Sequence, residues 1–576
     1  MATVTPVVVA RVLILVLGAL VVAPAASAAR VLLPGTTYEH TVQFTPSGPV
    51  AIHVVVGPRP NGLYALRPVL SNDSIVGVER LTSMQRRLST TGTFVGTNAD
   101  FWEWATGRPT GIFMQQATLA SAPFGQRSSV GVTIDGALDV RRIGFLGRWR
   151  GLGRLRVLHA LNKTPAAGQA ALFTSAWGPT TPAVPDSVAA VFSPFPTATP
   201  NTELTATAVE LRHEPSIAIP PGGAVLVARG AAAETLQAEV APGTQVVVRL
   251  GLQPDWPGVV HAVGGGPQIV RDGAPILRAE EWFTTYQLGE RHPRTAIGQR
   301  ADGSIVLVVS DGRRPGYSVG MTNAELAQTM VRFGAVTASA LDAGGSSTLA
   351  FDGRLLNRPS DPGGERAIST ALLYTYLGVF APAPQPVVSP NGDGVADDPR
   401  LRVKLVNASA LTFALVAPDG SAAHTETSSR PPGTFAVTLP SPAAEGKWTL
   451  RAQAVDEAGQ TSSIERSFVV NKTLGFLQTS TPRLFLPPRG RRLGITWQQT
   501  RPATVAVTVA QQAGGVVRTV VHRGFDAGTH TVSWRGFDRR SRAVRGGSYV
   551  VRVSARNEIG RVQLSRSLTV RRIAGR

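Results

Sequence analysis

Polar residues gather in one stretch of the chain, residues 340–366, directly after an apolar run at 335–341 that is typical of a buried strand. Asp342 follows the run, and a Gly344-Gly345 turn then leads to three consecutive hydroxyl side chains. The next loop adds Asn357, Ser360, Asp361, Glu365 and Arg366. So many polar groups beside a strand are costly to bury unless a ligand uses them. The stretch therefore predicts a binding or catalytic site at a strand end.

Three carboxylates suit acid–base or nucleophilic chemistry: Asp342, Asp100 and Glu365. For Asp100 another role stays open, because an aspartate after a strand also closes an Asx turn, and Asn98 could do the same. Asp100 and Asp342 could also hold Ca²⁺ or Mg²⁺, which prefer oxygen ligands. We favour catalysis for Asp342 and leave the role of Asp100 undecided.

The glycines and hydroxyls of this stretch are typical of anion binding. Backbone amides of a Gly-rich turn, here Gly344, Gly345, Ser346 and Ser347, can point at phosphate oxygens. Ser346 could instead act as a covalent nucleophile, but no histidine stands beside it in the sequence as a base. A second glycine run at 264–266 is expected to allow close backbone packing under the site.

Arginines near these segments suit a phosphate group, because a guanidinium can donate two parallel hydrogen bonds to its oxygens. Our candidates are Arg294, Arg313 and Arg366, in that order. The chain has 53 arginines and only 4 lysines, and a GC-rich genome also explains such usage. Position beside the motifs, rather than arginine content, therefore selects these three.

The elements that must position these residues are mainly strands. Short apolar runs between turn residues predict strands at 50–56, 93–96, 130–134, 224–228, 244–250, 304–310 and 335–341. A helix is expected at 322–333, where Thr322 and Glu325 form a capping-box pattern, and another near 231–239. We expect an α+β catalytic domain with mixed sheets over residues 30–380.

The rest of the chain predicts two all-β domains. A proline-rich segment at 381–386 is expected to be an extended, semi-rigid linker. Residues 387–470 and 471–576 then show short alternating runs separated by turns, which are typical of immunoglobulin-like sandwiches.

Composition excludes some classes of site and favours some partners. The chain has no cysteine, so disulfides and thiolate metal sites are excluded. Of the net charge of +20, residues 472–576 contribute +17, from 20 basic and 3 acidic residues. We expect this segment to be drawn to an anionic cell-wall polymer. Nucleic acid is not expected as a partner, because no base-stacking pattern of aromatic residues interleaves the arginines.

The first 28 residues resemble a secretory signal peptide. Arg11 precedes an unbroken apolar stretch at 12–22, and Ala26-Ser27-Ala28 fits the small-residue rule for cleavage. We expect a secreted or cell-surface protein, with an uncleaved N-terminal membrane anchor as the alternative.

Several blocks of residues occur in an order that resembles a known family. They are G-T-N-A-D-F-W at 96–102, G-R-P-T-G at 107–111, A-V-G-G-G-P at 262–267, R-T-A-I-G at 294–298, S-D-G-R at 310–313, G-M-T-N-A-E-L-A at 320–327, and the stretch 340–366. Over roughly residues 38–378 the chain thus resembles the phosphodiester glycosidase family, which includes N-acetylglucosamine-1-phosphodiester α-N-acetylglucosaminidase, the "uncovering" enzyme.

The resemblance implies a hydrolase that acts on a sugar joined through a phosphodiester, with Asp342, Asp100 and Glu365 as catalytic residues. No cofactor is required by that chemistry, and Ca²⁺, structural or at the active site, is the alternative. The substrate-binding residues it implies are Arg294, Arg313, Asn98, Gly344, Gly345, Ser346, Ser347, Asn357, Ser360 and Arg366.

Two residues depart from the family pattern. Ala343 stands where the family usually has glycine, which is expected to remove one freedom of the turn. Trp102 stands where a phenylalanine is common, which is expected to change the volume of the pocket and with it the preferred sugar.

The C-terminal domains resemble bacterial modules. Residues 389–398, S-P-N-G-D-G-V-A-D-D, are similar to the opening of immunoglobulin-like domains of secreted proteins, and 528–553 resemble the flagellar-hook-capping type. Asn391, Asp393 and Asp397 could bind Ca²⁺ and stiffen the linker, with a solvated turn as the equal alternative.

The function that these observations favour is an exported hydrolase that cleaves the glycosyl bond of a sugar-1-phosphodiester in envelope or extracellular glycans. Two alternatives stay open. One is a metal-dependent phosphodiesterase that cuts the P–O bond, and the other is a non-catalytic surface protein that only binds glycan.

Overall fold

The structure is a computed structural model that describes residues 29–277, 280–440, 443–486, 492–512 and 514–572. Strands make up 52% of it and helices 7%, so the protein is mostly β, with several sheets. The expected α+β character of the large domain is limited, within the described residues, to four short α-helices: α1 (Leu81–Arg87), α2 (Ala231–Glu239), α3 (Thr285–Gly289) and α4 (Asn323–Arg332).

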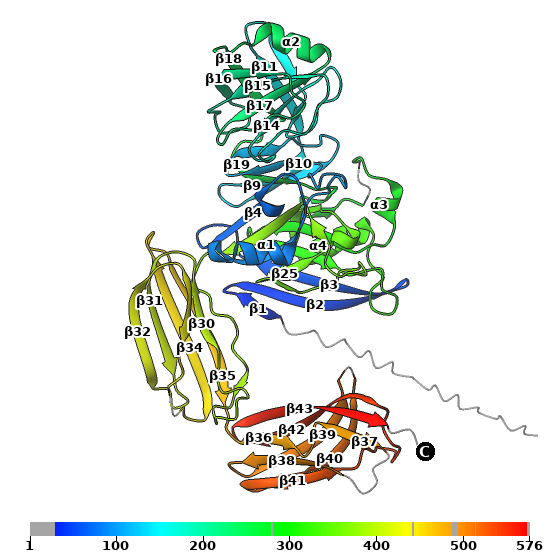
Figure 1. The fold of residues 1–576 in the computed structure, drawn as a ribbon, viewed down its shortest axis with the longest axis vertical. Coiled ribbons are helices and arrows are strands. Elements are labelled where there is room, and N and C mark those ends of the chain that lie inside the picture. Colours follow the sequence, from blue (N-terminus) through cyan, green and yellow to red (C-terminus); the bar gives the residue numbers. More distant parts are fainter. Residues whose placement is uncertain (1–28, 278–279, 441–442, 487–491, 513, 573–576) are drawn as a thin grey trace, which may run out of the picture.

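Three sheets of the large domain enclose one main core (Figure 1). The first has the order β1 (Arg30–Leu33), β2 (Thr36–Thr45), β3 (Gly48–Gly57), β23 (Ile305–Ser310), β22 (Arg294–Arg300), β24 (Ala335–Ala340), β20 (Gln268–Arg271) and β21 (Ala274–Pro275). The second has the order β26 (Arg354–Leu355), β25 (Leu349–Phe351), β6 (Thr93–Asn98), β28 (Thr370–Tyr376) and β4 (Tyr64–Leu70). The third has the order β10 (Leu138–Arg142), β9 (Ser128–Thr133), β19 (Val259–Gly264), β7 (Phe113–Gln115) and β8 (Thr118–Ser121).

The inner strands of these sheets are buried on both faces, which explains their continuous apolar runs. Every residue of β23 and of β28 is buried. On the outer face of the first sheet, α4 packs Leu326 and Met330 against the strands. The predicted capping box is confirmed, because Thr322 and Glu325 exchange side-chain-to-backbone hydrogen bonds of 3.2 and 3.0 Å.

Residues 143–258 form a separate subdomain that is inserted between β10 and β19, the two neighbours of β9 in the third sheet. Its eight-stranded sheet packs around a core that continues to Ile112, Met114 and Leu119 at the third sheet, and α2 packs on it at the top of Figure 1. The strand order is β12 (Arg156–Leu158), β11 (Gly144–Arg150), β18 (Gln245–Gln253), β16 (Glu203–Arg212), β15 (Ser187–Phe192), β17 (Ala224–Arg229), β14 (Ala170–Thr174) and β13 (Ala160–Leu161). Strand patterns alone did not reveal this division of residues 30–380, because both parts show the same short apolar runs.

Two β-sandwiches follow the large domain, each with a core of its own. The first pairs a sheet of β29 (Val387–Val388), β35 (Thr461–Val470), β34 (Gly446–Asp456), β31 (Ser409–Val416) and β32 (Ala422–Arg430) with β30 (Leu401–Leu405) and β33 (Gly433–Val437). The second pairs β36 (Leu474–Thr479), β38 (Leu493–Gln499) and β41 (Gly528–Trp534) with β37 (Arg483–Leu486), β43 (Gly560–Arg572), β42 (Gly547–Asn557), β39 (Ala503–Gln511) and β40 (Val516–Phe525).

The core of the first sandwich already includes residues at the start of the expected linker. Val379 and Ala381 are buried in its core, and Arg466 Nε donates a 2.7 Å hydrogen bond to the Ala381 carbonyl. The start of the proline-rich segment is thus held by the sandwich, because its apolar side chains find partners there.

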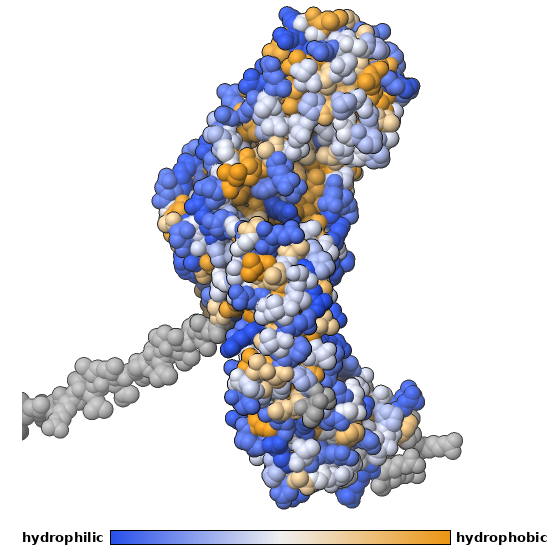
Figure 2. Space-filling view, turned by 90° about the vertical axis from the view of Figure 1, so that its left-hand side faces the viewer, coloured by the Kyte–Doolittle hydropathy of each residue, from blue (hydrophilic) through white to orange (hydrophobic). Residues whose placement is uncertain are grey.

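Among the described residues, no helix is both long and apolar enough to cross a membrane. The expected signal peptide, residues 1–28, lies outside the described residues and stays a prediction. In the view of Figure 2, hydrophobic and hydrophilic side chains are mixed over the surface, with separate hydrophobic patches on the upper part of the molecule.

Candidate active site

Asp100 and Asp342 lie on neighbouring segments at the ends of strands from two different sheets. Asp100 follows β6 and Asp342 follows β24. The Asp342 amide donates a 2.8 Å hydrogen bond to the Ala99 carbonyl, and Asn98 Nδ2 donates one of 2.6 Å to the Asp342 carbonyl. The fold thus brings together two carboxylates that are 242 positions apart in the sequence.

Asp100 is enclosed by backbone. Its two carboxylate oxygens accept hydrogen bonds from the amides of Phe101 (2.8 Å) and Gly111 (2.6 Å). On another side, a Cβ added to Gly264 would lie 2.5 Å from Cγ of Asp100, so only glycine fits there. This confirms that the glycine run at 264–266 allows close packing under the site. Burial raises the pKa of Asp100 to about 7; the neighbouring Asp342 adds to this, and the two amides oppose it.

Asp342 is half-buried and lines a cavity of about 190 Å³. Burial raises the pKa of its carboxyl to about 6. The Ala343 amide at 2.8 Å and the cations Arg366 and Arg127 oppose this change, because they stabilise the charged carboxylate. The Ser346 hydroxyl also lies close enough to lower this pKa, although its geometry is too poor for a formed hydrogen bond. At neutral pH, Asp342 is therefore a charged base beside a protonatable Asp100.

Two of the predicted arginines reach the Gly344-Gly345 turn. Gly344 has a φ of +69°, and a Cβ there would lie 3.0 Å from Nη2 of Arg313. At Gly345 a Cβ would collide with Arg366, whose guanidinium forms a two-pronged pair with Asp361 at 2.7 and 3.0 Å. Each glycine therefore makes room for a guanidinium over the turn.

Arg294 lines the same cavity, but its guanidinium is held by backbone. It donates to the carbonyls of Met321 (2.9 Å) and Glu290 (2.7 Å). Burial lowers the pKa of Arg294 to about 10, so it stays charged at neutral pH. Arg294 therefore has a structural role in addition to any contact with a substrate.

Four buried hydroxyl oxygens of the polar stretch make no hydrogen bond within the described residues: Ser346, Ser347, Thr348 and Ser360. Each unpaired buried polar group costs about 1–3 kcal/mol. Three of them are consecutive in the sequence directly after the glycine turn, which indicates a place where a ligand or water completes the hydrogen bonding.

The structure does not bring Glu365 to the cavity, which corrects its assignment as a catalytic residue. Both of its oxygens accept hydrogen bonds from Thr82, from the amide at 2.8 Å and from the hydroxyl at 2.6 Å. Glu365 therefore holds the first turn of α1. Sequence proximity to Arg366 was misleading, because the two side chains have different partners: Glu365 binds Thr82, whereas Arg366 pairs with Asp361 beside Gly345.

Asn98 and Asn357 are buried and act as cross-links rather than as lining residues. Asn98 Oδ1 accepts from the Thr295 hydroxyl (2.8 Å) and the Thr348 amide (3.1 Å). Asn357 donates to Asp311 and to the Ser347 carbonyl, at 3.0 and 3.1 Å. Both hold the 342–348 segment in place, so their contribution to a substrate site is indirect.

Asp311, within the S-D-G-R motif, anchors the strand end that carries Arg313. It accepts hydrogen bonds from His53, Tyr317 and Asn357 at 3.1, 2.8 and 3.0 Å. Burial by itself would raise the pKa of Asp311, but these donors outweigh burial and lower it. This network was not expected from the sequence, because its members come from distant segments.

Arg127 is a residue of the candidate site that could not be predicted from the sequence. Its guanidinium carbon lies 4.8 Å from the Phe101 ring and 4.3 Å from the Phe283 ring, and its charge acts on both Asp100 and Asp342. Burial lowers the pKa of Arg127, and these carboxylates oppose the change. Arg127 stands in no family block, and nothing local distinguishes it from other arginines.

The two residues that depart from the family pattern differ in position, since Ala343 lines the cavity and Trp102 does not. Ala343 has an extended backbone with a φ of −122°, so a glycine is not needed there. Trp102 lies against Trp104, with ring centroids 4.5 Å apart and planes tilted by 48°, and does not line the cavity around Asp342. Its expected effect on pocket volume and on the preferred sugar stays a prediction.

In the 391–397 loop, backbone amides donate hydrogen bonds to the carboxylate oxygens of the aspartates. Asp397 accepts from the amides of Asn391, Gly392 and Gly394 at 2.9, 3.1 and 2.7 Å, and Asp393 accepts from that of Phe476 at 2.8 Å. Across the described residues, no group of three or more His, Cys, Asp or Glu side chains is placed to hold a metal ion. The arrangement fits a turn closed by amide donors, and calcium binding here stays a prediction.

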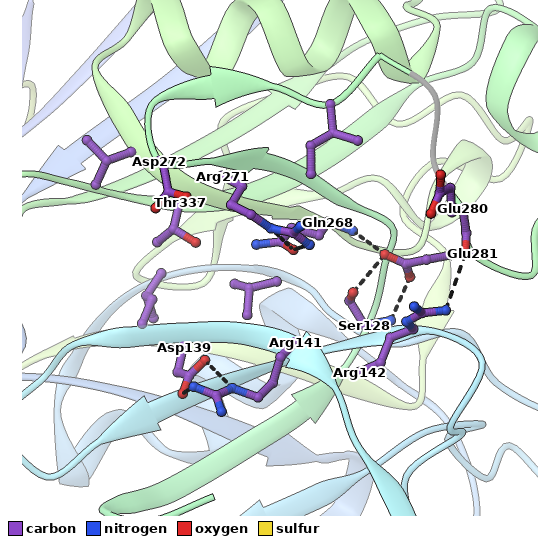
Figure 3. Close-up of a pocket in the computed structure, with 14 residues that line it drawn as sticks. Ser128, Asp139, Arg141, Arg142, Gln268, Arg271, Asp272, Glu280, Glu281 and Thr337 are labelled. Atoms are coloured by element: carbon purple, nitrogen blue, oxygen red, sulfur yellow. Dashed lines mark hydrogen bonds and ion pairs between the residues drawn. The ribbon is translucent and has the colours of Figure 1, made fainter. Parts of the chain in front are cut away.

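A larger cavity of about 780 Å³ lies between β10 and β24, but it is not the candidate active site (Figure 3). Some of its charged side chains have partners, such as Arg141 with Asp139. Glu281 accepts hydrogen bonds from Ser128 and from the Gln268 amide, and so ties β9 to β20. None of the residues predicted for the site lines this cavity, whereas Asp342, Arg294 and Arg313 line the smaller one.

In comparison with known proteins, two segments of the chain match family models. The phosphodiester glycosidase family model matches residues 197–375, and the FlgD Ig-like domain model matches residues 489–558. The first match includes Asp342, Arg313 and Arg366, whereas Asp100 and Arg127 lie before it.

Individual relatives cover only part of the chain. The SPbeta prophage-derived uncharacterized protein YomE of Bacillus subtilis is 37% identical over 119 residues, which are 21% of this chain and 18% of that protein. A hypothetical protein from Synechocystis has a crystal structure with a TM-score of 0.50 and 25% identity, covering 59% of this chain and 62% of its own. The catalytic domain of zebrafish N-acetylglucosamine-1-phosphodiester α-N-acetylglucosaminidase gives 15% identity and a TM-score of 0.34, over 61% of this chain and 86% of its own.

The chain spans less than two thirds of the length of the Synechocystis protein and about a fifth of that of YomE. The motifs from residue 262 onward nevertheless lie within the family match at residues 197–375, whereas those at 96–102 and 107–111 lie before it. The chain is therefore similar to the phosphodiester glycosidase family at residues 197–375 and to the FlgD Ig-like domain family at residues 489–558.

Proposed function

We propose that this protein is an exported hydrolase that cleaves the glycosyl bond of a sugar-1-phosphodiester in envelope or extracellular glycans. One observation carries the proposal: Asp342 lines a small cavity directly before a glycine turn that two guanidiniums overlie. This places a base beside an anion site, which is the arrangement that hydrolysis of a sugar phosphodiester needs.

The phosphate is held at the Gly344-Gly345 turn. Arg313 and Arg366 donate to its oxygens, and the charged Arg294 adds positive potential from the cavity wall. The guanidiniums also stabilise the negative charge that collects on phosphate when it leaves. Because phosphate is a weakly basic leaving group, its departure needs no strong general acid.

Asp342 is the general base. It takes a proton from water while the water oxygen bonds to the anomeric carbon and the bond from that carbon to the phosphate oxygen breaks. The bonding electron pair stays on phosphate, and the products are a free sugar and a phosphomonoester. Asp100 and Arg127 position this base and set its charge. The pKa of Asp100 is raised by the charge of Asp342, and the cation Arg127 stabilises the charged form of both carboxylates.

Product identification tests the proposal. The purified protein is incubated with methyl N-acetylglucosamine-1-phosphate diester, and the products are separated and identified. Free N-acetylglucosamine supports the proposal. N-acetylglucosamine-1-phosphate would refute it and indicate a phosphodiesterase that cuts the P–O bond.

Substitution of the base separates catalysis from glycan binding. Asp342→Asn is expected to lower kcat by at least about a hundredfold, with substrate affinity and Tm close to wild type. Asp139→Asn, a partly exposed carboxylate of the larger cavity, is the matched control. Turnover by Asp342→Asn equal to that of the control would refute the role of Asp342.

The placement of the enzyme at the envelope is part of the proposal. The N-terminal pattern supports export, and the excess positive charge of residues 472–576 supports attraction to anionic wall polymer. Mass spectrometry of the secreted protein is expected to show a mature N-terminus at Ala29. Binding to isolated cell walls is expected to weaken steeply as salt rises, and salt-independent binding would contradict the electrostatic account.

A further inference from the structure

A second cavity, of about 420 Å³, adjoins the cavity around Asp342. Phe283 and Gln287 line both, so the segment that carries them is the wall between the two. The second cavity is lined by Glu103, Arg108, Thr110, Phe124, Arg127, Lys163, Trp282, Phe283, Thr284 and Gln287.

This second cavity has an excess of positive charge. Arg108 is paired with Glu103 at 2.7 Å, whereas Arg127 and Lys163 form no ion pair within the described residues. Lys163 is exposed and comes from the inserted subdomain, while Arg127 directly precedes β9 of the third sheet, outside the insertion. An anion in this cavity would therefore contact both parts of the large domain.

One wall of the second cavity is an exposed aromatic ring. Trp282 is 68% exposed, and its indole is stacked on Phe124 with centroids 5.4 Å apart and planes 17° apart. The partner ring fixes the orientation of the indole and leaves its other face open. An open, rigid aromatic face beside cations is suited to the apolar face of a sugar ring.

We propose that the second cavity binds the next sugar-phosphate unit of an oligomeric substrate, so that the enzyme acts on glycans with repeating sugar-1-phosphodiester links. The sugar of this unit lies on Trp282, and its phosphate accepts hydrogen bonds from Arg127 and Lys163. This inference rests on the proposed function, since the first unit occupies the cavity around Asp342.

The test compares a one-unit with a two-unit substrate. The first is methyl N-acetylglucosamine-1-phosphate diester, and the second carries one more N-acetylglucosamine-1-phosphate. The wild-type protein is expected to show a kcat/KM about tenfold higher for the two-unit compound, as one charge-assisted contact and one stacked ring imply. Trp282→Ala and Lys163→Ala are each expected to remove most of this ratio.

Matched controls come from exposed residues outside both cavities. Phe44→Ala and Lys447→Ala remove an exposed aromatic ring and an exposed ammonium, and both are expected to keep the wild-type ratio. A wild-type ratio of one, or Trp282 and Lys163 variants that keep the wild-type ratio, would overturn the inference.

Binding to Asp342→Asn separates this inference from the proposed function. Calorimetric titration of this variant is expected to show about tenfold tighter binding of the two-unit compound, with a preference that falls as salt rises. If the wild-type protein hydrolyses neither compound, the proposed function fails, and this preference still supports the second cavity as a binding site. Equal Kd values, or no binding of either compound, would overturn the inference.

Discussion

Gly264→Ala is expected to disable the site by displacing Asp100. A Cβ at this position would lie 2.5 Å from Cγ and 2.7 Å from Oδ1 of Asp100, and closer still to Oδ2. Real Cβ contacts of this length are essentially absent, so the carboxylate must move by about 0.5–1 Å. The side chain is short and already held by two backbone amides, and it cannot swing aside as a long side chain would.

The size of the effect follows from those hydrogen bonds. The amides of Phe101 and Gly111, at 2.8 and 2.6 Å, would lose a buried acceptor. Each loss costs about 1–3 kcal/mol, so the free energy of unfolding is expected to fall by about 2–6 kcal/mol. A misplacement of about 1 Å at the site is expected to lower kcat/KM by about a hundredfold.

The assay combines thermal unfolding with kinetics on the one-unit phosphodiester. Gly363→Ala is the control, since a Cβ there meets nothing within 4 Å and the residue lies in the same polar stretch. A Gly264→Ala protein with wild-type Tm and kcat/KM would refute the view that Asp100 is enclosed and positioned by backbone.

Three further predictions concern the charges of the site. Because the base must be deprotonated and the pKa of Asp342 is raised to about 6, kcat/KM is expected to rise with pH through about 6 and to level off above it; a flat profile from pH 4 to 8 would contradict this. Arg127→Met removes a cation that lowers the pKa of Asp100 and Asp342, so this acidic limb is expected to shift to higher pH in the same assay, and an unshifted limb would argue against the role of Arg127. Glu365→Gln weakens the hydrogen bonds to Thr82 and is expected to reduce the free energy of unfolding by about 1 kcal/mol, measured in urea, with little change in kcat; a large fall in kcat would restore Glu365 as a catalytic candidate.

Much of the local structure could be predicted because its cause is local. The helix 231–239 is observed as Ala231–Glu239, and the capping box at Thr322 forms as its pattern indicates. The predicted strands are found because apolar runs that are bounded by turn residues and too short for a typical helix suit buried strands. The position of Asp342 after a strand, with a glycine turn behind it, follows from the same argument.

The assignment of roles within the site could not be derived in this way. Glu365 and Arg366 are adjacent in sequence, yet one holds α1 and the other overlies Gly345. Arg127 carries no local signal and becomes important only through its distance from Phe101, Phe283 and the two carboxylates.

The sequence by itself determined where the polar stretch lies, which elements flank it, and that a carboxylate and a glycine turn occupy the end of a strand. Only the tertiary structure decided that Asp100 meets Asp342, that residues 143–258 form a separate subdomain, and that Lys163 from it faces Arg127 across a second cavity. The physical reason is the distance along the sequence over which the interactions act. Turns, caps and periodic burial depend on neighbours within a few residues. The charge, burial and partners of a site instead depend on segments that meet only after the sheets have packed.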